Sequence, residues 1–355
     1  MLNREDAKNA KGAQNLRALR FFSEYLLTSG QAISQAHKQE EEAVMAFASK
    51  TRPVRFLRTL RGREALAFYT FILPWAIGFL VFTLGPIIAS FGLSFMDYDL
   101  ILPPKFVGLA NFQELFSDSL FYISMSNTLY IVVLAVPLGL LTSFGMALLL
   151  NQKVRGLAAY RTAFYMPSIV PAVASAALWL YVLQPDWGLL NGFLSIFGIT
   201  GPGWLASEVW SKPSIILLMI WASGGSMIIF LAGLQNIPRE YYEAAEIDGA
   251  NAVRRFRHIT LPQMTPTIFF NLVMGVIGTF QVFSVVFVLT DGMGGPVNST
   301  LVYLIYIYRN AFNFFRMGYA SSMALVLFVI ILALTLIQFR TARFWVHYGT
   351  DTVEG

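Results

Sequence analysis

Long apolar runs alternate with short polar segments along most of this chain. Six runs are long enough to cross a bilayer, which takes about 20 residues of helix. They cover residues 66–95, 121–150, 158–183, 214–236, 265–290 and 319–339. A helix satisfies its own backbone hydrogen bonds, so apolar runs of this length cross lipid as helices. The pattern predicts an all-α membrane protein with six transmembrane helices.

The composition supports this interpretation. The chain is 56% hydrophobic and only 13% charged, with a mean hydropathy of +0.59, whereas soluble domains are about 25% charged. It contains no cysteine, which excludes disulfides, a thiolate nucleophile and a cysteine metal site. The formal charge of +5 fits basic loops on one side of a membrane better than a nucleic-acid surface.

The placement of Lys and Arg predicts the orientation. If the N-terminus is cytoplasmic, the cytoplasmic segments hold 21 Lys and Arg and the outside loops hold four; without residues 1–64 the ratio is nine to four. Basic loops stay in the cytoplasm, so both termini are predicted to lie there. The expected organisation is a tail (1–50), a basic interfacial helix (51–64), a transmembrane domain (65–345) and a C-terminus (346–355).

The longest charged interval between the first and last spans is 238–262, which this orientation makes cytoplasmic. Pro238 suits the start of a helix, Glu240 suits its N-terminal turn, and Gly249 suits its end. A helix of about three turns is predicted here. One face of it would carry small side chains that fit a groove on another molecule, formed by Tyr241, Ala244, Ala245 and Asp248.

None of the predicted spans contains Asp, Glu or Lys. Ion-coupled carriers and voltage sensors usually need an ionisable group inside the membrane, so this class is disfavoured. Uncharged polar and aromatic residues remain as candidates for a substrate path, because hydroxyl hydrogen bonds and ring faces suit a sugar; the alternative is that they only pack helices together. These candidates are Trp221, Ser223, Ser226, Asn271, Thr279, Phe280, Gln281 and Ser284.

Motifs of catalysis are missing. The sequence has no phosphate-binding G-x-x-x-x-G-K-[ST] loop and no H-E-x-x-H pattern, and its three His are far apart. The carboxylates of 240–248 have no second ligand-bearing segment, so a protein-contacting face is favoured over a metal site. A membrane-embedded enzyme would need a convergent catalytic set, which is not seen. The aromatic segment 299–317 is predicted to pack at the interface or to re-enter the protein.

Several motifs resemble one family. Glu243-Ala-Ala, then Gly249, then Ile259-Thr-Leu-Pro262 resembles the EAA loop of the membrane subunits of ABC importers. The resemblance extends through Phe106-Val-Gly-Leu-Ala-Asn-Phe112, Gly188-Leu-Leu-Asn191, Gly294-Gly-Pro296 and Gly318-Tyr-Ala320. It covers about 65–340 and is similar to the carbohydrate branch of the type I importers, in particular the larger maltose and the first glycerol-phosphate permease subunits.

This resemblance implies a six-helix permease fold with a cytoplasmic coupling helix, in a bacterial inner membrane. The implied partners are a second permease, two ATPase subunits and a periplasmic or tethered solute-binding protein. ATP and Mg would bind the ATPase, with no cofactor, metal or catalytic residue on this chain. Amino acids, phosphate, glycerol-phosphate or an acidic sugar stay open as substrates beside a neutral oligosaccharide. The residues implied to couple to the ATPase are Glu240, Glu243, Ala244, Ala245, Asp248, Gly249, Leu261 and Pro262.

Overall fold

The computed structural model describes residues 38, 39, 41, 42, 60–152 and 155–347, and it divides into two units at Leu84. Most of the predicted tail, residues 51–59 of the predicted interfacial helix and residues 348–355 lie outside the described residues. In the first unit, helix α2 (Leu60–Phe79) continues into the π-helix η2 (Leu80–Leu84). Residues 60–64 therefore belong to the start of a long apolar helix.

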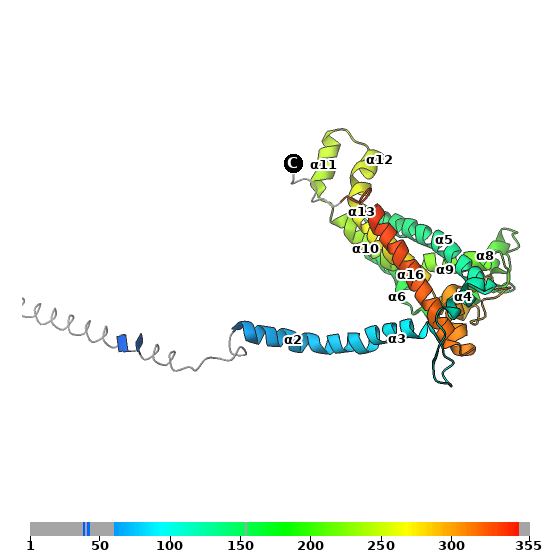
Figure 1. The fold of residues 1–355 in the computed structure, drawn as a ribbon. Coiled ribbons are helices and arrows are strands. Elements are labelled where there is room, and N and C mark those ends of the chain that lie inside the picture. Colours follow the sequence, from blue (N-terminus) through cyan, green and yellow to red (C-terminus); the bar gives the residue numbers. More distant parts are fainter. Residues whose placement is uncertain (1–37, 40, 43–59, 153–154, 348–355) are drawn as a thin grey trace, which may run out of the picture. The chain divides into compact units, whose positions relative to one another are not determined.

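In the second unit, Gly85–Gly355, nearly all of the described secondary structure is helical (Figure 1). Its only described strands are the two-residue antiparallel pair β1 (Met96–Asp97) and β2 (Lys105–Phe106). Its α-helices are α3 (Gly85–Leu93), α4 (Ala110–Ser117), α5 (Ser119–Leu150), α6 (Leu157–Ile169), α7 (Ala172–Val182), α8 (Leu189–Ile196), α9 (Ser211–Trp221), α10 (Gly224–Gln235), α11 (Arg239–Ile247), α12 (Ala252–Arg255), α13 (Leu261–Phe280), α14 (Ser284–Leu289), α15 (Tyr303–Tyr308) and α16 (Met317–Ala342). Three shorter helices are η3 (Trp204–Ala206), η4 (Phe256–Thr260) and η5 (Arg309–Asn313).

Four described helices are long and apolar enough to cross a membrane, namely Glu64–Leu93, Ser119–Leu150, Ala252–Phe280 and Met317–Ala342. Two bent pairs, α6 with α7 and α9 with α10, pass the same test together and bring the number of candidate spans to as many as six. The predicted all-helical membrane fold is confirmed. The fifth span differs from its predicted bounds, since its helix starts at Ala252 and stops at Phe280.

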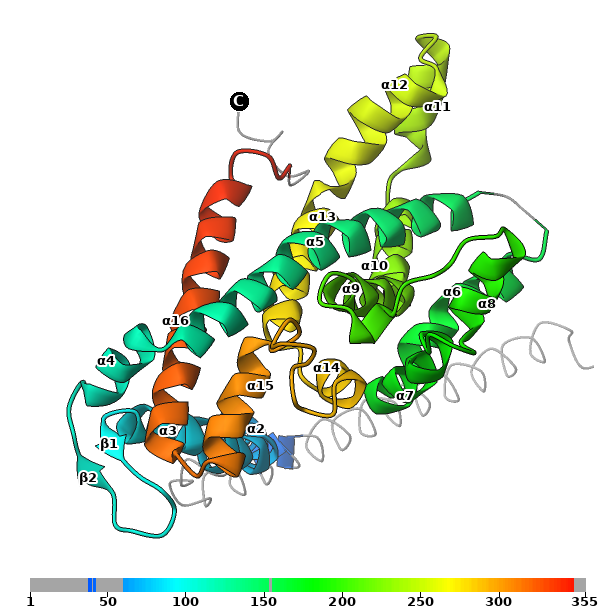
Figure 2. The ribbon, with the colours of Figure 1, turned by 90° about the vertical axis from the view of Figure 1, so that its right-hand side faces the viewer.

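Helix α5 is the centre of the second unit, and Figure 2 shows it crossing α13 beside α9 and α10. Its buried side chains, among them Ile131 and Val136, join a core that also includes Trp179, Ile215 and Phe280. Other side chains of α5, such as Leu141, are exposed, because apolar residues surround this helix instead of forming one stripe. A second core around Met227, Phe230 and Met264 lies where α10 and α13 pack together.

Polar contacts join the ends of α5, α15 and α16. Asp118 caps α5 by accepting the N–H of Leu120 at 2.9 Å, and it also accepts the hydroxyls of Tyr306 and of Tyr319, the latter at 2.8 Å. Burial and the bond to Asp118 raise the pKa of Tyr306 to about 12, so its hydroxyl stays a donor near neutral pH. Tyr303, fully buried, donates to the Met323 carbonyl.

The predicted packing of the aromatic segment 299–317 is thus confirmed for Tyr303 and Tyr306. Phe312, Phe314 and Phe315 of the same segment are exposed.

Candidate functional site

The predicted helix in the charged interval is present as α11. Pro238 occupies its N-cap position, and Gly249 adopts a left-handed conformation with φ of +73° just after its end. The N–H of Gly249 donates to Glu246 O at 3.0 Å, and the N–H of Ala250 donates to Ala245 O at 2.8 Å. This is a Schellman motif, which satisfies the last carbonyls of a helix and needs a residue that tolerates positive φ. The predicted helix stop at Gly249 is confirmed.

Helix α11 turns back into α12, and three contacts hold the resulting hairpin (239–260). Asn251 caps α12 by accepting the N–H of Arg254 at 2.9 Å. Glu246 forms an ion pair with Arg255. The Tyr242 and Thr260 hydroxyls lie 3.0 Å apart and form a hydrogen bond. The two arms of the hairpin are therefore connected at its tip, its middle and its base.

The hairpin projects from one end of the second unit (Figures 1 and 2). Ile247 at the tip is 88% exposed, and Tyr241 and Val253 are exposed as well. Large apolar side chains that are exposed on a charged, projecting segment are typical of a protein-binding surface. Of the predicted coupling residues, Ala245 and Pro262 are half-buried, and the exposed ones are Glu240, Glu243, Ala244, Asp248, Gly249 and Leu261.

A polar cleft of about 690 Å³ lies at the base of α11. Arg161 from α6 and Arg239 and Glu243 from α11 line it together with the end of α5 at Asn151. The Nε atom of Arg161 is buried and has no hydrogen-bond partner within the described part of the chain. The cleft thus brings charges of both signs beside the hairpin. Arg161 lies near the start of the predicted span 158–183, and nothing in the sequence connects it with α11.

The second region of interest is a set of three helix breaks. Helices α6 and α7 meet at Val170 and Pro171 with a bend of 100°, and α9 and α10 meet at Ala222 and Ser223 with a bend of 45°. Helix α13 ends at Phe280, and α14 starts only at Ser284. Breaks of this kind within spans place backbone and polar groups where a transporter can bind its substrate.

The predicted path residues divide by exposure. Trp221, Gln281 and Ser284 are exposed at two of the breaks, and Ser223 and Ser226 are half-buried. The remaining three are buried inside this chain, and they are Asn271, Thr279 and Phe280. Asn271 donates to the Thr267 carbonyl one turn earlier. These three side chains pack in the core of this chain, so the exposed candidates for the substrate path are the ones at the helix breaks.

Trp179 on α7 was missed by sequence reasoning. It is only 8% exposed, and its ring meets that of Trp221 edge to face at 5.8 Å between centroids. Its indole N–H is buried without a hydrogen-bond partner among the described residues, and so is the hydroxyl of Ser223. Buried donors without partners are uncommon because each costs about 1–3 kcal/mol. Nothing in the apolar pattern of α7 distinguishes this Trp from one that only packs.

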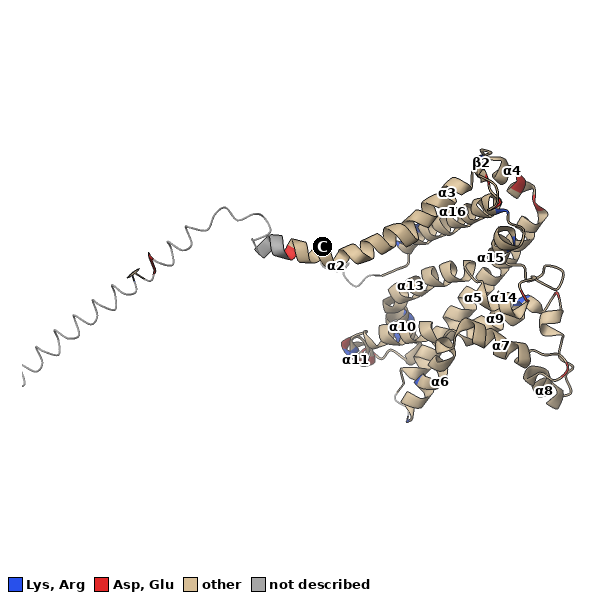
Figure 3. Cartoon of the chain, turned by 90° about the horizontal axis from the view of Figure 1, so that it is seen from below, with Lys and Arg blue, Asp and Glu red and all other residues tan. Residues whose placement is uncertain are grey.

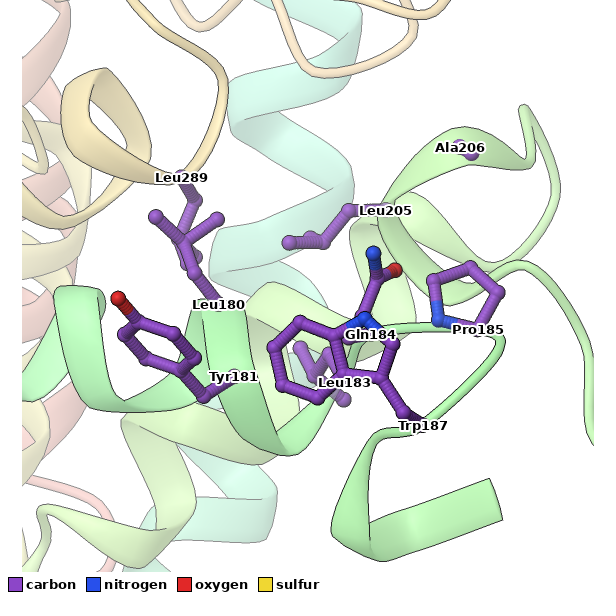
Figure 4. A pocket seen from close by; sticks show the side chains of 9 residues that line it. All are labelled: Leu180, Tyr181, Leu183, Gln184, Pro185, Trp187, Leu205, Ala206 and Leu289. Atoms are coloured by element: carbon purple, nitrogen blue, oxygen red, sulfur yellow. The ribbon is translucent and has the colours of Figure 1, made fainter. Parts of the chain in front are cut away.

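A pocket of about 370 Å³ lies where α7 ends (Figure 4). Tyr181 and Trp187, whose rings lie 5.8 Å apart, line it with Leu205 and Leu289. Gln184 supplies an amide side chain, and none of the lining residues is charged. Figure 3 places this end of the second unit, marked by α8, opposite the end marked by α11. The lining of this pocket therefore differs from that of the cleft at the base of α11, since the pocket has no charged lining residue and the cleft has several.

No three His, Asp or Glu side chains of the described residues come close enough to hold a metal ion.

Comparisons with known proteins agree with this geometry. Residues 135–344 match the family described as "Binding-protein-dependent transport system inner membrane component". The chain is 47% identical over 294 residues to the probable ABC transporter permease protein YesP of Bacillus subtilis (strain 168), covering 82% of this chain and 94% of that protein. It is 36% identical over 281 residues to the lactose transport system permease protein LacF of Rhizobium radiobacter, covering 78% of this chain and 93% of that protein.

Among solved structures, a bacterial ABC transporter involved in the import of the acidic polysaccharide alginate matches with a TM-score of 0.70 and 28% identity. The match covers 79% of this chain and 96% of that one. The fold and the sequence thus lead to the same family, as the Glu243-Ala-Ala loop had indicated. The chain belongs to the inner-membrane components of binding-protein-dependent ABC transporters, and it is a multi-pass permease subunit and not itself an enzyme.

Proposed function

We propose that this chain is one of two permease subunits of an ATP-driven importer for a carbohydrate of the oligosaccharide class. One related permease belongs, by its name, to a lactose transport system, and the matched structure is of a transporter involved in the import of alginate. The open residues at the helix breaks, Trp221, Gln281 and Ser284, are uncharged. An aromatic ring with amide and hydroxyl groups suits the C–H face and the hydroxyls of a sugar.

The observation that carries the proposal is the connection between the hairpin and two of the breaks. Helix α10 runs from the break at Ser223 to the start of the hairpin, and α13 runs from the hairpin to the break at Gln281. The two helices pack against each other. A force on the hairpin is therefore transmitted along two rigid rods of about 18 Å and 30 Å to the residues that would line the path.

In this proposal α11 is the coupling helix and docks in a groove of a separate ATPase subunit, which binds ATP and Mg. The exposed Ile247 and Tyr241 supply apolar contact, and Glu243 lies beside Arg239 in the cleft at the base. The excess of Lys and Arg on the α11 side makes this side cytoplasmic. The complex then holds this chain, a second permease, two ATPase subunits and a solute-binding protein that delivers substrate at the α8 end.

A charge reversal tests the coupling. Glu243→Lys is expected to leave the complex in the membrane and to abolish uptake and substrate-stimulated ATP hydrolysis, because the reversed charge opposes docking of α11. Glu208→Lys is the matched control, since Glu208 is also exposed but lies at the other end, after η3. Uptake at the wild-type rate in the Glu243 variant would exclude α11 as the coupling element, and an equal loss in both variants would indicate a general effect of charge.

The substrate is tested separately. Copurification from native membranes, followed by a ligand screen on the binding protein, is expected to return an oligosaccharide. A phosphorylated or amino-acid ligand would refute the carbohydrate assignment while leaving the permease family intact.

A further inference from the structure

Helix α8 presents an apolar stripe that no other described part of the chain covers. The stripe consists of Leu189, Phe193, Ile196 and Phe197, which follow one another at helical spacing and are all exposed, Leu189 by 74% and Ile196 by 77%. Leu190, in contrast, is half-buried against the main core. The helix is therefore apolar on two sides, and only one of them is explained by packing within this chain.

The stripe is held in a fixed position. The side chain of Asn191 donates to the carbonyls of Pro185 at 2.9 Å and Pro202 at 3.3 Å, and it accepts the indole N–H of Trp204 at 2.7 Å. Gly201 lies so close that a methyl group there would come within 1.9 Å of Asn191 Oδ1. These contacts tie α8 to the chain before and after it. The exposed stripe cannot turn inward without breaking this network.

The stripe itself and the chain that follows it carry no charge, and the nearest carboxylate before it is Asp186, which lines a cleft with Asn191 and Ser195. No Asp, Glu, Lys, Arg or His occurs between Trp187 and Ser207, and the first charged residues on either side are Asp186 and Glu208. The neighbouring pocket, which Figure 4 shows with Tyr181 and Trp187 at its edge, has no charged lining residue either. Trp and Tyr beside an uncharged apolar surface at the end of a span are typical of the membrane interface.

We infer that α8 lies in the lipid headgroup region and buries this stripe in the leaflet at the α8 end of the spans. A soluble binding protein is a poor occupant, because it leaves in every transport cycle and would expose the stripe to water each time. The proposed ATPase site is at the opposite end, on α11. Lipid is always present and matches an uncharged apolar face that continues directly from the candidate span α6–α7. The inference needs only a membrane-embedded chain and does not depend on the substrate.

The test uses the absence of natural cysteines. Phe193→Cys on the stripe and Ser195→Cys on the opposite side of α8 each carry one environment-sensitive fluorophore, in the assembled transporter with cysteine-free partners in lipid nanodiscs. Ser195 is exposed too, so it is a matched control. Lipids with a nitroxide on the acyl chain near the headgroup are expected to quench the label at 193 at least threefold more than the label at 195, and aqueous iodide is expected to show the reverse order.

Three outcomes would overturn the inference. Equal iodide quenching at both positions would mean that the stripe faces water. Protection of position 193 from both quenchers would mean that a protein covers the stripe. If this protection appears only when the binding protein is added, the binding protein covers the stripe. If it is present without the binding protein, the second permease covers it. Ile196→Cys supplies an independent label on the same stripe if the variant at 193 does not assemble.

Discussion

Gly249 at the tip of the hairpin allows a graded test of the coupling proposal. Its φ is +73°, and a methyl group added there would meet no atom within 4 Å, so a substitution costs only backbone conformational energy. For Ala the left-handed conformation costs about 1–2 kcal/mol. Asn tolerates this conformation better, and a β-branched residue tolerates it worst. The structure therefore predicts that the turn weakens in the order Gly, Asn, Ala, Val.

The expected size of the effect follows from this cost. A free-energy change of about 1–2 kcal/mol changes the population of the open turn by roughly 5–30-fold. The amide of Ala250, which bonds to the Ala245 carbonyl at 2.8 Å, should exchange its hydrogen faster by the same factor in Gly249→Ala. If α11 couples this chain to an ATPase, substrate-stimulated ATP hydrolysis should fall in the same order across the three variants.

Gly198 is a matched control for this series. It follows α8 with the same φ of +73° and with no atom within 4 Å of an added methyl group, and its N–H donates to Ser195 O at 3.0 Å. Gly198→Ala should weaken its own turn by a similar amount and leave ATP hydrolysis unchanged. Wild-type hydrolysis in Gly249→Val, or an equal loss in Gly198→Ala, would refute the reasoning.

Three further predictions concern packing and the path. Gly224→Ala should destabilise the complex by about 1–3 kcal/mol and lower its melting temperature, because the added methyl group would lie 2.4 Å from the Phe164 carbonyl oxygen. Gly225→Ala is the control and should leave the melting temperature unchanged, because a methyl group there would meet no atom within 4 Å. Tyr319→Phe should lower the free energy of unfolding by about 1.5–3 kcal/mol, because the hydrogen bond to the Asp118 carboxylate is lost. In a double-mutant cycle with Tyr306→Phe the two losses should be non-additive, because both hydroxyls donate to the same carboxylate oxygen. Gln281→Leu should lower uptake more than the yield of assembled complex, and loss of assembly alone would mean that Gln281 only packs.

Hydropathy predicted the helices that cross without interruption. The expected runs 121–150 and 319–339 correspond to α5 and α16, each of which starts two residues before the predicted run. It could not reveal the bends, because a 100° turn at Pro171 lies inside a run that stays apolar throughout. Pro171 was the available signal, since a proline restricts the residue before it to extended conformations. The stop of α13 at Phe280 had no such marker, because Gln281 is followed again by apolar residues.

The hairpin was predictable because its signals are local. Pro238 at the start, a carboxylate in the first turn and Gly249 at the end each act within one turn of the helix. The path was less predictable, because exposure depends on how helices far apart in sequence pack. Thr279 and Gln281 look equivalent as sequence, but Thr279 is buried in the core while Gln281 is exposed beyond the last turn of α13.

Two contacts join the break at Ser223 to the rest of the bundle. Ser143 of α5 donates its hydroxyl to the Ser223 carbonyl at 3.1 Å, which ties the break to the central helix. On the other side, Gly224 lies directly against the backbone of α6 at Phe164, only a few residues before the α6–α7 bend. Because α10 contacts α6 here without an intervening side chain, the coupling proposal predicts that a displacement of α10 by the hairpin also displaces the bend at Pro171. The close contact at Gly224 would thus transmit one movement from the hairpin to two breaks. A methyl group at this position should push α10 away from α6 and weaken that transmission, while the structure of α11 stays unchanged.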